Sequence, residues 1–246
     1  MRPLPKIDLR PHFLTLRDLP AGPIDCRSFF GNDHPVELEV GCGRGLFLQT
    51  SALAHPDRNY LGVEYEMKEA RRAALRLHKR DLPNVRVLGA NVFEVLPKLI
   101  PDQSVAAVHV YFPDPWWKRR HRKRRVFSAT FLSQVTRVLP PGGWLHSWTD
   151  VEEYFGVITE LVKSHPAFES HPPPEEREAQ HDLDYHTSFE RKKRQLGLPI
   201  YRARWQRNEI ANTDPRLSAW LAAANAAEPD PDPLSPAETV ESPDRP

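Results

Sequence analysis

Short apolar segments alternate with amphipathic segments along most of this chain, and that alternation limits the folds open to it. The expected strands cover residues 36–40, 60–64, 85–88, 105–112, 144–149 and 200–206. The expected helices cover residues 46–54, 67–80, 92–99, 127–139, 154–163 and 187–197. Strands that alternate with helices of about ten to fifteen residues indicate βαβ units. Because such crossovers are right-handed, the sequence predicts an α/β fold with a doubly wound, Rossmann-like, mostly parallel sheet.

The two ends of the chain differ from its middle. Residues 1–34 are proline-rich, and we expect a partly ordered arm with a hint of order at 13–16. Residues 228–246 carry six acids against one arginine, together with six prolines, which predicts a disordered tail. The segment 211–227 has the pattern of one more helix. We therefore expect one domain over residues 35–210, and a loop over the proline- and glutamate-rich segment 170–181.

Cysteine usage and hydropathy favour a cytoplasmic protein. The chain has only two cysteines, Cys26 and Cys42, and no signal-peptide pattern. No apolar run approaches the roughly 20 residues that a membrane-spanning helix needs. No Cys/His spacing resembles a zinc site, so we expect neither a membrane nor a metal as partner.

The turn after the first of the six expected strands reads Gly41-x-Gly43-x-Gly45 and leads directly into a helix. Glycines permit close backbone approach and a helix start presents free N–H groups, which together make a cradle for a ligand. The third glycine comes one position early for the usual dinucleotide motif. Glu39, just before the turn, favours a ligand with a cationic amino-acid end, such as S-adenosylmethionine. A nicotinamide cofactor and a domain without ligand stay open.

Two more polar residues follow the next strands. Glu64 ends its strand, where a carboxylate can accept hydrogen bonds from both ribose hydroxyls of a nucleoside. Asn91 follows the third strand and can bond the adenine edge through its amide. The alternative for Glu64 is an ordinary surface acid.

The stretch from Tyr111 to Arg125 joins two unlike pieces. Asp114 stands between two prolines at the end of a buried strand, with Trp116 and Trp117 behind it, and strand ends are where open α/β sheets bind ligands. Positions 118–125 then hold seven cations and one histidine. This arrangement suggests chemistry on a polyanion, although such runs are often only solvated. The tryptophans can stack on a nucleobase or pack beneath the loop.

Taken in order, the motifs of this chain closely resemble those of the bacterial tRNA (guanine-N(7)-)-methyltransferases. The resemblance covers about residues 35–208 and rests on Glu39-x-Gly41-x-Gly43-x-Gly45, Glu64, Phe112–Trp116, Lys118, Arg120–Arg125, Asp150 and Thr187-x-Phe189-Glu190. It implies a class I S-adenosylmethionine-dependent methyltransferase with a seven-stranded sheet. The implied product is N7-methylguanine at the variable-loop guanine, position 46, of tRNA, and the implied assembly is a monomer or a weak homodimer.

The resemblance also implies roles for individual residues. The catalytic role falls on Asp114. Cofactor binding falls on Glu39, Gly41, Gly43, Glu64, Asn91 and Asp114. Substrate binding falls on Lys118, Asp150, Thr187, Ser188, Phe189 and Glu190. RNA binding falls on Arg120, His121, Arg122, Lys123, Arg124 and Arg125. Many relatives carry Asp in place of Asn91, and some carry His in place of Trp117.

Guanine N7 already has a free lone pair, so its methylation needs no base, and catalysis should consist mainly of positioning. Asp114, supported by Asp150, would accept hydrogen bonds from guanine N1–H and the exocyclic amine. Two alternatives stay open. One is methylation of an exocyclic amine, since Asp114-Pro115-Trp116 is loosely similar to the Asp/Asn-Pro-Pro-aromatic loops of such enzymes. The other is a non-catalytic tRNA-binding protein.

Overall fold

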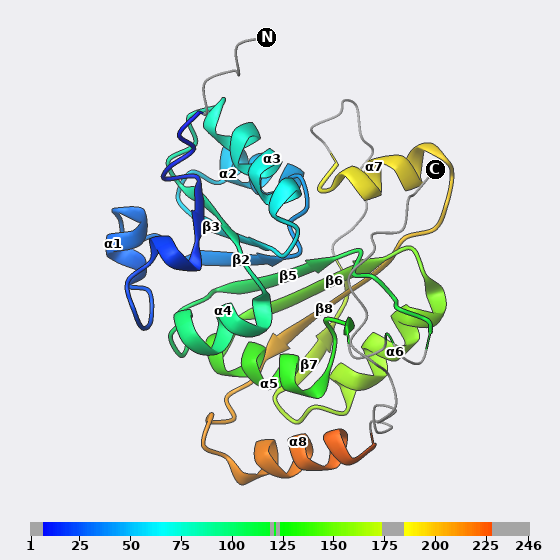
Figure 1. The fold of residues 1–246 in the computed structure, drawn as a ribbon. Coiled ribbons are helices and arrows are strands. Elements are labelled where there is room, and N and C mark those ends of the chain that lie inside the picture. Colours follow the sequence, from blue (N-terminus) through cyan, green and yellow to red (C-terminus); the bar gives the residue numbers. More distant parts are fainter. Residues whose placement is uncertain (1–6, 119–120, 122–123, 174–184, 228–246) are drawn as a thin grey trace, which may run out of the picture.

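A computed structural model describes residues 7–118, 121, 124–173 and 185–227 of the 246-residue chain (Figure 1). One sheet of eight strands runs through the molecule in the order β1-β4-β3-β2-β5-β6-β8-β7. The strands are β1 Phe13–Thr15, β2 Val36–Val40, β3 Asn59–Glu64, β4 Val85–Gly89, β5 Ala107–Tyr111, β6 Trp144–Thr149, β7 Phe168–His171 and β8 Tyr201–Arg207. All neighbours pair in parallel except β8, which is antiparallel to both β6 and β7. The doubly wound, mostly parallel α/β fold predicted from the sequence is confirmed.

Helices cover both faces of this sheet. They are α1 Cys26–Phe30, α2 Leu46–Ala54, α3 Met67–His78, α4 Val92–Leu99, α5 Ala129–Val138, α6 Glu152–Lys163, α7 Ser188–Gln195 and α8 Pro215–Ala227, with a short 3-10 helix at Leu16–Asp18. In Figure 1, α2, α3 and α7 lie on one side of the sheet and α4, α5 and α6 on the other. The last helix, α8, packs beside α5.

Two apolar clusters hold these layers together. On one face, Leu48 of α2 and Leu77 of α3 are completely buried against β3 and β4. On the other face, Phe131 of α5 and Ile158 of α6 are equally buried against the central strands. Each fully buried side chain of this size contributes about 1.5–3 kcal/mol of burial free energy. The regular alternation of strand and helix in the sequence therefore reflects a sheet with an apolar layer on either side.

The sheet has one strand more than the seven expected, and both edge strands were difficult to foresee. β1 comes from the arm expected before the domain and pairs with β4, with Phe13 opposite Val87. β7 includes Ser170 and His171, which the sequence predicted as the start of a loop; that prediction was wrong there. β1 has only three residues, where the sequence shows a hint of order, and three of the four residues of β7 are polar, so neither strand shows a clear apolar periodicity. The remaining part of the expected loop, 174–181, lies outside the described residues.

The order of strands fixes where a ligand can bind. β2 lies between β3 and β5, so the chain leaves β2 and β5 toward helices on opposite faces of the sheet. The carboxyl ends of these parallel strands therefore frame the crevice in which open α/β sheets bind ligands. Among the described helices, none has the length and apolar character needed to cross a bilayer.

Candidate functional site

The glycine turn at the end of β2 has a conformation that side chains disfavour. Gly41, Gly43 and Gly45 all have positive φ, of 73°, 51° and 67°. The backbone N–H groups of Gly41 and Cys42 both donate to the carbonyl of Val63, at 2.8 and 3.2 Å, which ties the turn to β3. A side chain at Gly45 would also place its Cβ 2.9 Å from the Cβ of Ala73 in α3. The turn is thus fixed, and it leaves room beside Gly41 and Gly43.

Glu64, at the end of β3, closes one side of this turn. Its Oε2 accepts from the Gly43 N–H and its Oε1 from the Glu66 N–H, each at 2.8 Å. Burial raises the pKa of Glu64, and these two N–H groups oppose the shift. Each carboxylate oxygen retains a further lone pair. The side chain is therefore oriented in advance to accept two more hydrogen bonds, as the hydroxyls of a ribose would provide.

Glu39 is the most unusual group at the site. Its side chain is only 3% exposed, and its Oε2 has no hydrogen-bond partner among the described residues. Burial first, and the nearby Glu64 second, raise the pKa of Glu39 to about 8. A buried carboxyl without a partner is unfavourable. A cationic amino group bound at the turn would remove that penalty, so the residues present fit S-adenosylmethionine.

Asn91 follows β4 and caps α4. Its Oδ1 accepts from the Phe93 N–H at 3.0 Å, and the neighbouring Ala90 N–H donates to the carbonyl of Glu64. This hydrogen bond uses one lone pair of Oδ1, and the two N–H groups of the amide can still donate to a ligand. Asn91 thus lies beside the Glu64 strand end, as the predicted adenine contact requires.

Asp114 is exposed, on a partly buried loop at the end of β5. Two non-glycine residues with positive φ bracket it, Phe112 at 52° and Trp116 at 39°. Such conformations are strained and concentrate at functional sites. Lys118, at the end of this loop, is exposed. The strand end therefore presents a carboxylate and an ammonium group to the open side.

Neither tryptophan of the loop belongs to the buried core. Trp116 is half-buried, meets His121 edge to face at 5.6 Å and lies 5.2 Å below the guanidinium of Arg124. Trp117 is 46% exposed. Arg124 is exposed, whereas Arg125 is half-buried and donates from Nε to the carbonyl of Pro115. The predicted RNA contacts Arg120, Arg122 and Lys123 lie outside the described residues.

The residues at the start of α7 form another side of the candidate site. The Thr187 hydroxyl accepts from the Glu190 N–H at 3.0 Å, and Glu190 accepts from the His186 N–H at 2.6 Å. Glu190 is 2% exposed and pairs with Arg194 and Arg202, each at 3.5 Å. Two predicted substrate contacts, Thr187 and Glu190, are therefore engaged in starting α7 and fastening it to β8.

Other residues at the start of α7 lie next to the segments that follow β5 and β6. Phe189 is half exposed, and its ring stacks on that of Phe112 at 5.9 Å and 24°. Ser188 begins the helix and is half-buried. Asp150, after β6, pairs with Lys193 of α7 at 2.6 Å. The sequence suggests Lys193 only as one cation of a basic helix face, and its pairing with Asp150, across 43 positions, leaves no local signal. The structure thus brings Asp114, Asp150 and Phe189 to one edge of the sheet together with Glu39 and Glu64.

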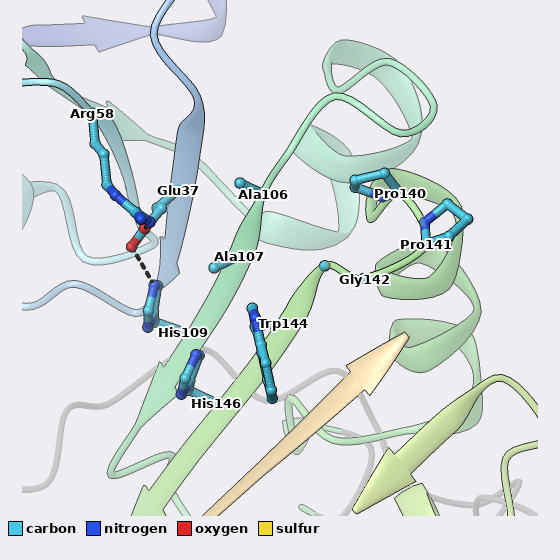
Figure 2. Close-up of a pocket in the computed structure, with 11 residues that line it drawn as sticks. Glu37, Arg58, Ala106, Ala107, His109, Pro140, Pro141, Gly142, Trp144 and His146 are labelled. Carbon is cyan, nitrogen blue, oxygen red and sulfur yellow. Dashed lines mark hydrogen bonds and ion pairs between the residues drawn. The ribbon is translucent and has the colours of Figure 1, made fainter. Parts of the chain in front are cut away.

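A separate pocket of about 390 Å³ opens at the amino ends of β5 and β6, between His109, Trp144 and His146 (Figure 2). Its acid, Glu37, already binds Arg58 and, at 2.9 Å, His109. Burial opposes ionisation, but these two partners lower the pKa of Glu37 to about 2. The pocket lies at the opposite strand ends from the glycine turn, and its charges are internally paired. The carboxyl edge is therefore the better candidate for a reactive site.

No three histidine, cysteine, aspartate or glutamate side chains in the described ranges gather in a way that could hold a metal ion.

Comparison with known proteins adds direct relatives. Residues 33–203 match a family model described as "Putative methyltransferase". The tRNA (guanine-N(7)-)-methyltransferase of Rhodopirellula baltica is 47% identical over 82% of this chain and 76% of its own length. The enzyme of that name from Nitrosococcus oceani is 34% identical, over 78% and 79%. Among solved structures, the aminoglycoside resistance methyltransferase NpmB1 is 17% identical with a TM-score of 0.49, over 72% of this chain and 89% of that one.

Proposed function

This chain belongs to the bacterial tRNA (guanine-N(7)-)-methyltransferase family, and we propose that it forms N7-methylguanine at the variable-loop guanine of tRNA with S-adenosylmethionine as methyl donor. The family predicted from the motifs is confirmed by these relatives. The observation that best supports the activity is the buried Glu39 carboxyl, whose Oε2 has no hydrogen-bond partner in the described part of the chain, beside the glycine turn and Glu64.

The cofactor would be held by residues from three strand ends. Glu39 would bind its amino group, Glu64 its ribose hydroxyls and Asn91 its adenine edge, with Gly41 and Gly43 allowing the backbone to approach. S-adenosylmethionine supplies a methyl group on a sulfonium, which N7 of guanine attacks in line. The chain's own contribution is to hold the two partners at reacting distance and exclude water.

Two carboxylates would recognise the guanine. Asp114 would accept hydrogen bonds from guanine N1–H and the exocyclic amine, with Asp150 in support, and adenine cannot offer that donor pair. Positive charge moves onto the purine during transfer, and a nearby carboxylate favours that movement. Lys118 and the segment 187–190 complete the proposed substrate site. Phe189, stacked on Phe112 and half exposed, offers an aromatic surface beside the two carboxylates.

The cationic run would hold the RNA backbone. Phosphate contacts from Arg120, His121, Arg122, Lys123 and Arg124 position a nucleic acid without reading its sequence. Arg191 and Lys192 of α7 extend the same cationic character. Trp117 is the more exposed of the two tryptophans, which supports it as the ring that stacks on a base.

The organisation of the rest of the chain belongs to the same proposal. Residues 35–210 form most of the methyltransferase domain, 1–34 an arm that adds β1 to its sheet, 211–227 a segment with the C-terminal helix α8, and 228–246 an acidic tail. A protein that acts on tRNA would work in the cytoplasm, as a monomer or a weak homodimer. Size-exclusion chromatography with light scattering, at several concentrations, tests the assembly.

A methyl-transfer assay on unmodified tRNA tests the activity. Wild-type protein should transfer labelled methyl to tRNA, and borohydride–aniline treatment should then cut the product at the variable loop. A tRNA with adenine in place of that guanine is the control and should stay unlabelled. Label without chain cleavage would support methylation of an exocyclic amine instead. Tight tRNA binding without binding of S-adenosylmethionine would support a non-catalytic protein.

A further inference from the structure

The geometry points to a structural role for Arg125, which its position in a run of cationic residues does not suggest. We propose that Arg125 is a positioning residue that fastens the Asp114 loop to α6, and that it does not serve as a phosphate contact. This inference rests on the proposed methyl transfer to tRNA.

The Arg125 side chain contacts the protein through two different surfaces. Its Nε–H donates to the carbonyl of Pro115 at 2.7 Å. Its guanidinium carbon lies over the ring of Tyr154, in the first turn of α6, at 5.0 Å from the ring centre. The ring of Trp117 lies 5.8 Å away. A guanidinium over an aromatic ring is attractive at these distances, more so when it is shielded from water.

These contacts join the two strand ends that carry the proposed carboxylates. Asp114 immediately precedes Pro115, and Tyr154 follows Asp150 by four positions. Tyr154 is completely buried, so it is a fixed point in the core. Fastening Pro115 to Tyr154 therefore sets the distance between the loop after β5 and the segment after β6. Asp114 and Asp150 would have to hold one guanine between them, so this distance matters for turnover.

The conformation of the Asp114 loop also requires contacts from outside the loop. Phe112 and Trp116 both adopt positive φ, a strained conformation that persists only where surrounding contacts impose it. The bond from Arg125 to Pro115 acts on the residue adjacent to Trp116. Burial raises the pKa of Tyr154 to about 12, Arg125 lowers it and Asp114 raises it, which agrees with all three groups being neighbours.

Lysine cannot replace arginine in this arrangement. Arg125 donates from Nε to the Pro115 carbonyl while the rest of its guanidinium lies at the Tyr154 ring. A lysine carries its donors and its charge on one nitrogen atom and cannot divide them between the two partners in this way. A phosphate contact has no such requirement, since lysine also binds phosphate. Arg125→Lys therefore separates the two roles, because it keeps the charge and removes the planar fork.

The experiment compares Arg125→Lys with its neighbour Arg124→Gln, which alters an exposed cation of the same run. Turnover is measured at saturating tRNA and S-adenosylmethionine, and tRNA affinity is measured over a range of salt concentrations. We expect Arg125→Lys to lower kcat by about 10- to 100-fold. Its Kd for tRNA and its salt dependence should stay within twofold of wild type. Arg124→Gln should instead weaken tRNA binding and reduce the salt slope by about 0.7–0.9, and its loss of kcat should be smaller than that of Arg125→Lys.

A second variant guards against simple misfolding. Tyr154→Leu removes the ring beneath the guanidinium at similar volume, and should lower kcat while S-adenosylmethionine still binds. If Arg125 and Tyr154 act as one unit, the double variant loses less than the product of the two single losses. Wild-type kcat in Arg125→Lys, or independent losses in the double variant, would overturn the proposal. A wild-type protein inactive on tRNA would refute the proposed function itself, whatever Arg125 does.

Discussion

The carboxylate of Asp150 lies 2.6 Å from the ammonium group of Lys193, so the end of β6 is tied directly to α7. Both side chains are about a quarter exposed, at 24% and 25%. The pair joins the proposed guanine contact to the helix that carries Phe189. The free energy of this ion pair therefore helps to determine how firmly α7 is held against the end of β6.

A double-mutant cycle measures that strength. Urea denaturation of Asp150→Asn, Lys193→Met and the double variant should give a coupling of about 0.5–1 kcal/mol at low salt, and less at high salt. The control is the exposed pair of Glu160 and Lys163 in α6, at 3.9 Å, where we expect no measurable coupling. Equal coupling in the two pairs would mean that partial burial adds nothing to the Asp150 pair.

Asp114 should matter far more for turnover than for cofactor affinity. Replacing it by alanine removes the proposed acceptor for the guanine edge, while Glu39 and Glu64 keep their positions. We expect kcat to fall by at least about 100-fold and the Kd for S-adenosylmethionine to change less than threefold. Steady-state kinetics and calorimetry measure the two effects. Glu169→Ala, on the exposed edge strand β7, is the matched acid-to-alanine control. Near-normal turnover in Asp114→Ala would rule out its catalytic role.

The sequence predicts best those elements whose formation depends on neighbouring residues in the chain. α2 was predicted to the residue, Leu46–Ala54, because a glycine turn precedes it and an apolar face runs along it. β7 was missed because three of its four residues are polar and the residues of β8 with which it pairs lie 33 to 39 positions further along the chain. The strand stands at the edge of the sheet, where burial leaves little trace in the sequence.

In the candidate site, too, local sequence patterns identified residues but not their long-range contacts. Glu39, Glu64 and Asp114 were identified because each stands next to the end of an apolar strand. Residue type alone did not reveal that the Arg125 side chain turns inward to Pro115 while Arg124 stays exposed. Glu190 illustrates a second limit, since a residue of a recognition motif can serve the fold: its side chain helps to start α7 and pairs with two arginines.

Gly45 tests whether the turn tolerates a side chain. Gly45 and Gly142 both have positive φ, so alanine at either position should cost about 1–2 kcal/mol in unfolding free energy. Only at Gly45 does the new Cβ also meet a packed atom, the Ala73 Cβ at 2.9 Å. Overpacking adds about 1–3 kcal/mol, so Gly45→Ala should be the less stable variant by that margin. Equal losses in urea denaturation would show that α2 can shift away from α3 without cost.

Ionisation of Glu39 should couple cofactor binding to pH. The pKa of this buried carboxyl is about 8 rather than the ordinary 4.5, so it is largely protonated near neutral pH. Ionising it without a partner destabilises the folded protein. The unfolding free energy of wild type, relative to Glu39→Gln, should therefore fall as the pH rises from about 4.5 to about 8, and level off above.

Binding of a cationic amino group requires the ionised form, so affinity should move the opposite way. The association constant for S-adenosylmethionine should rise with pH between about 6 and 7.5, by at most about tenfold per pH unit, with release of a proton. Calorimetry in buffers of different ionisation enthalpy measures both quantities. Glu39→Gln cannot ionise, so its binding should be weaker and nearly independent of pH over this range. A wild-type affinity that is flat with pH, with no proton released, would mean that Glu39 does not pair with the amino group.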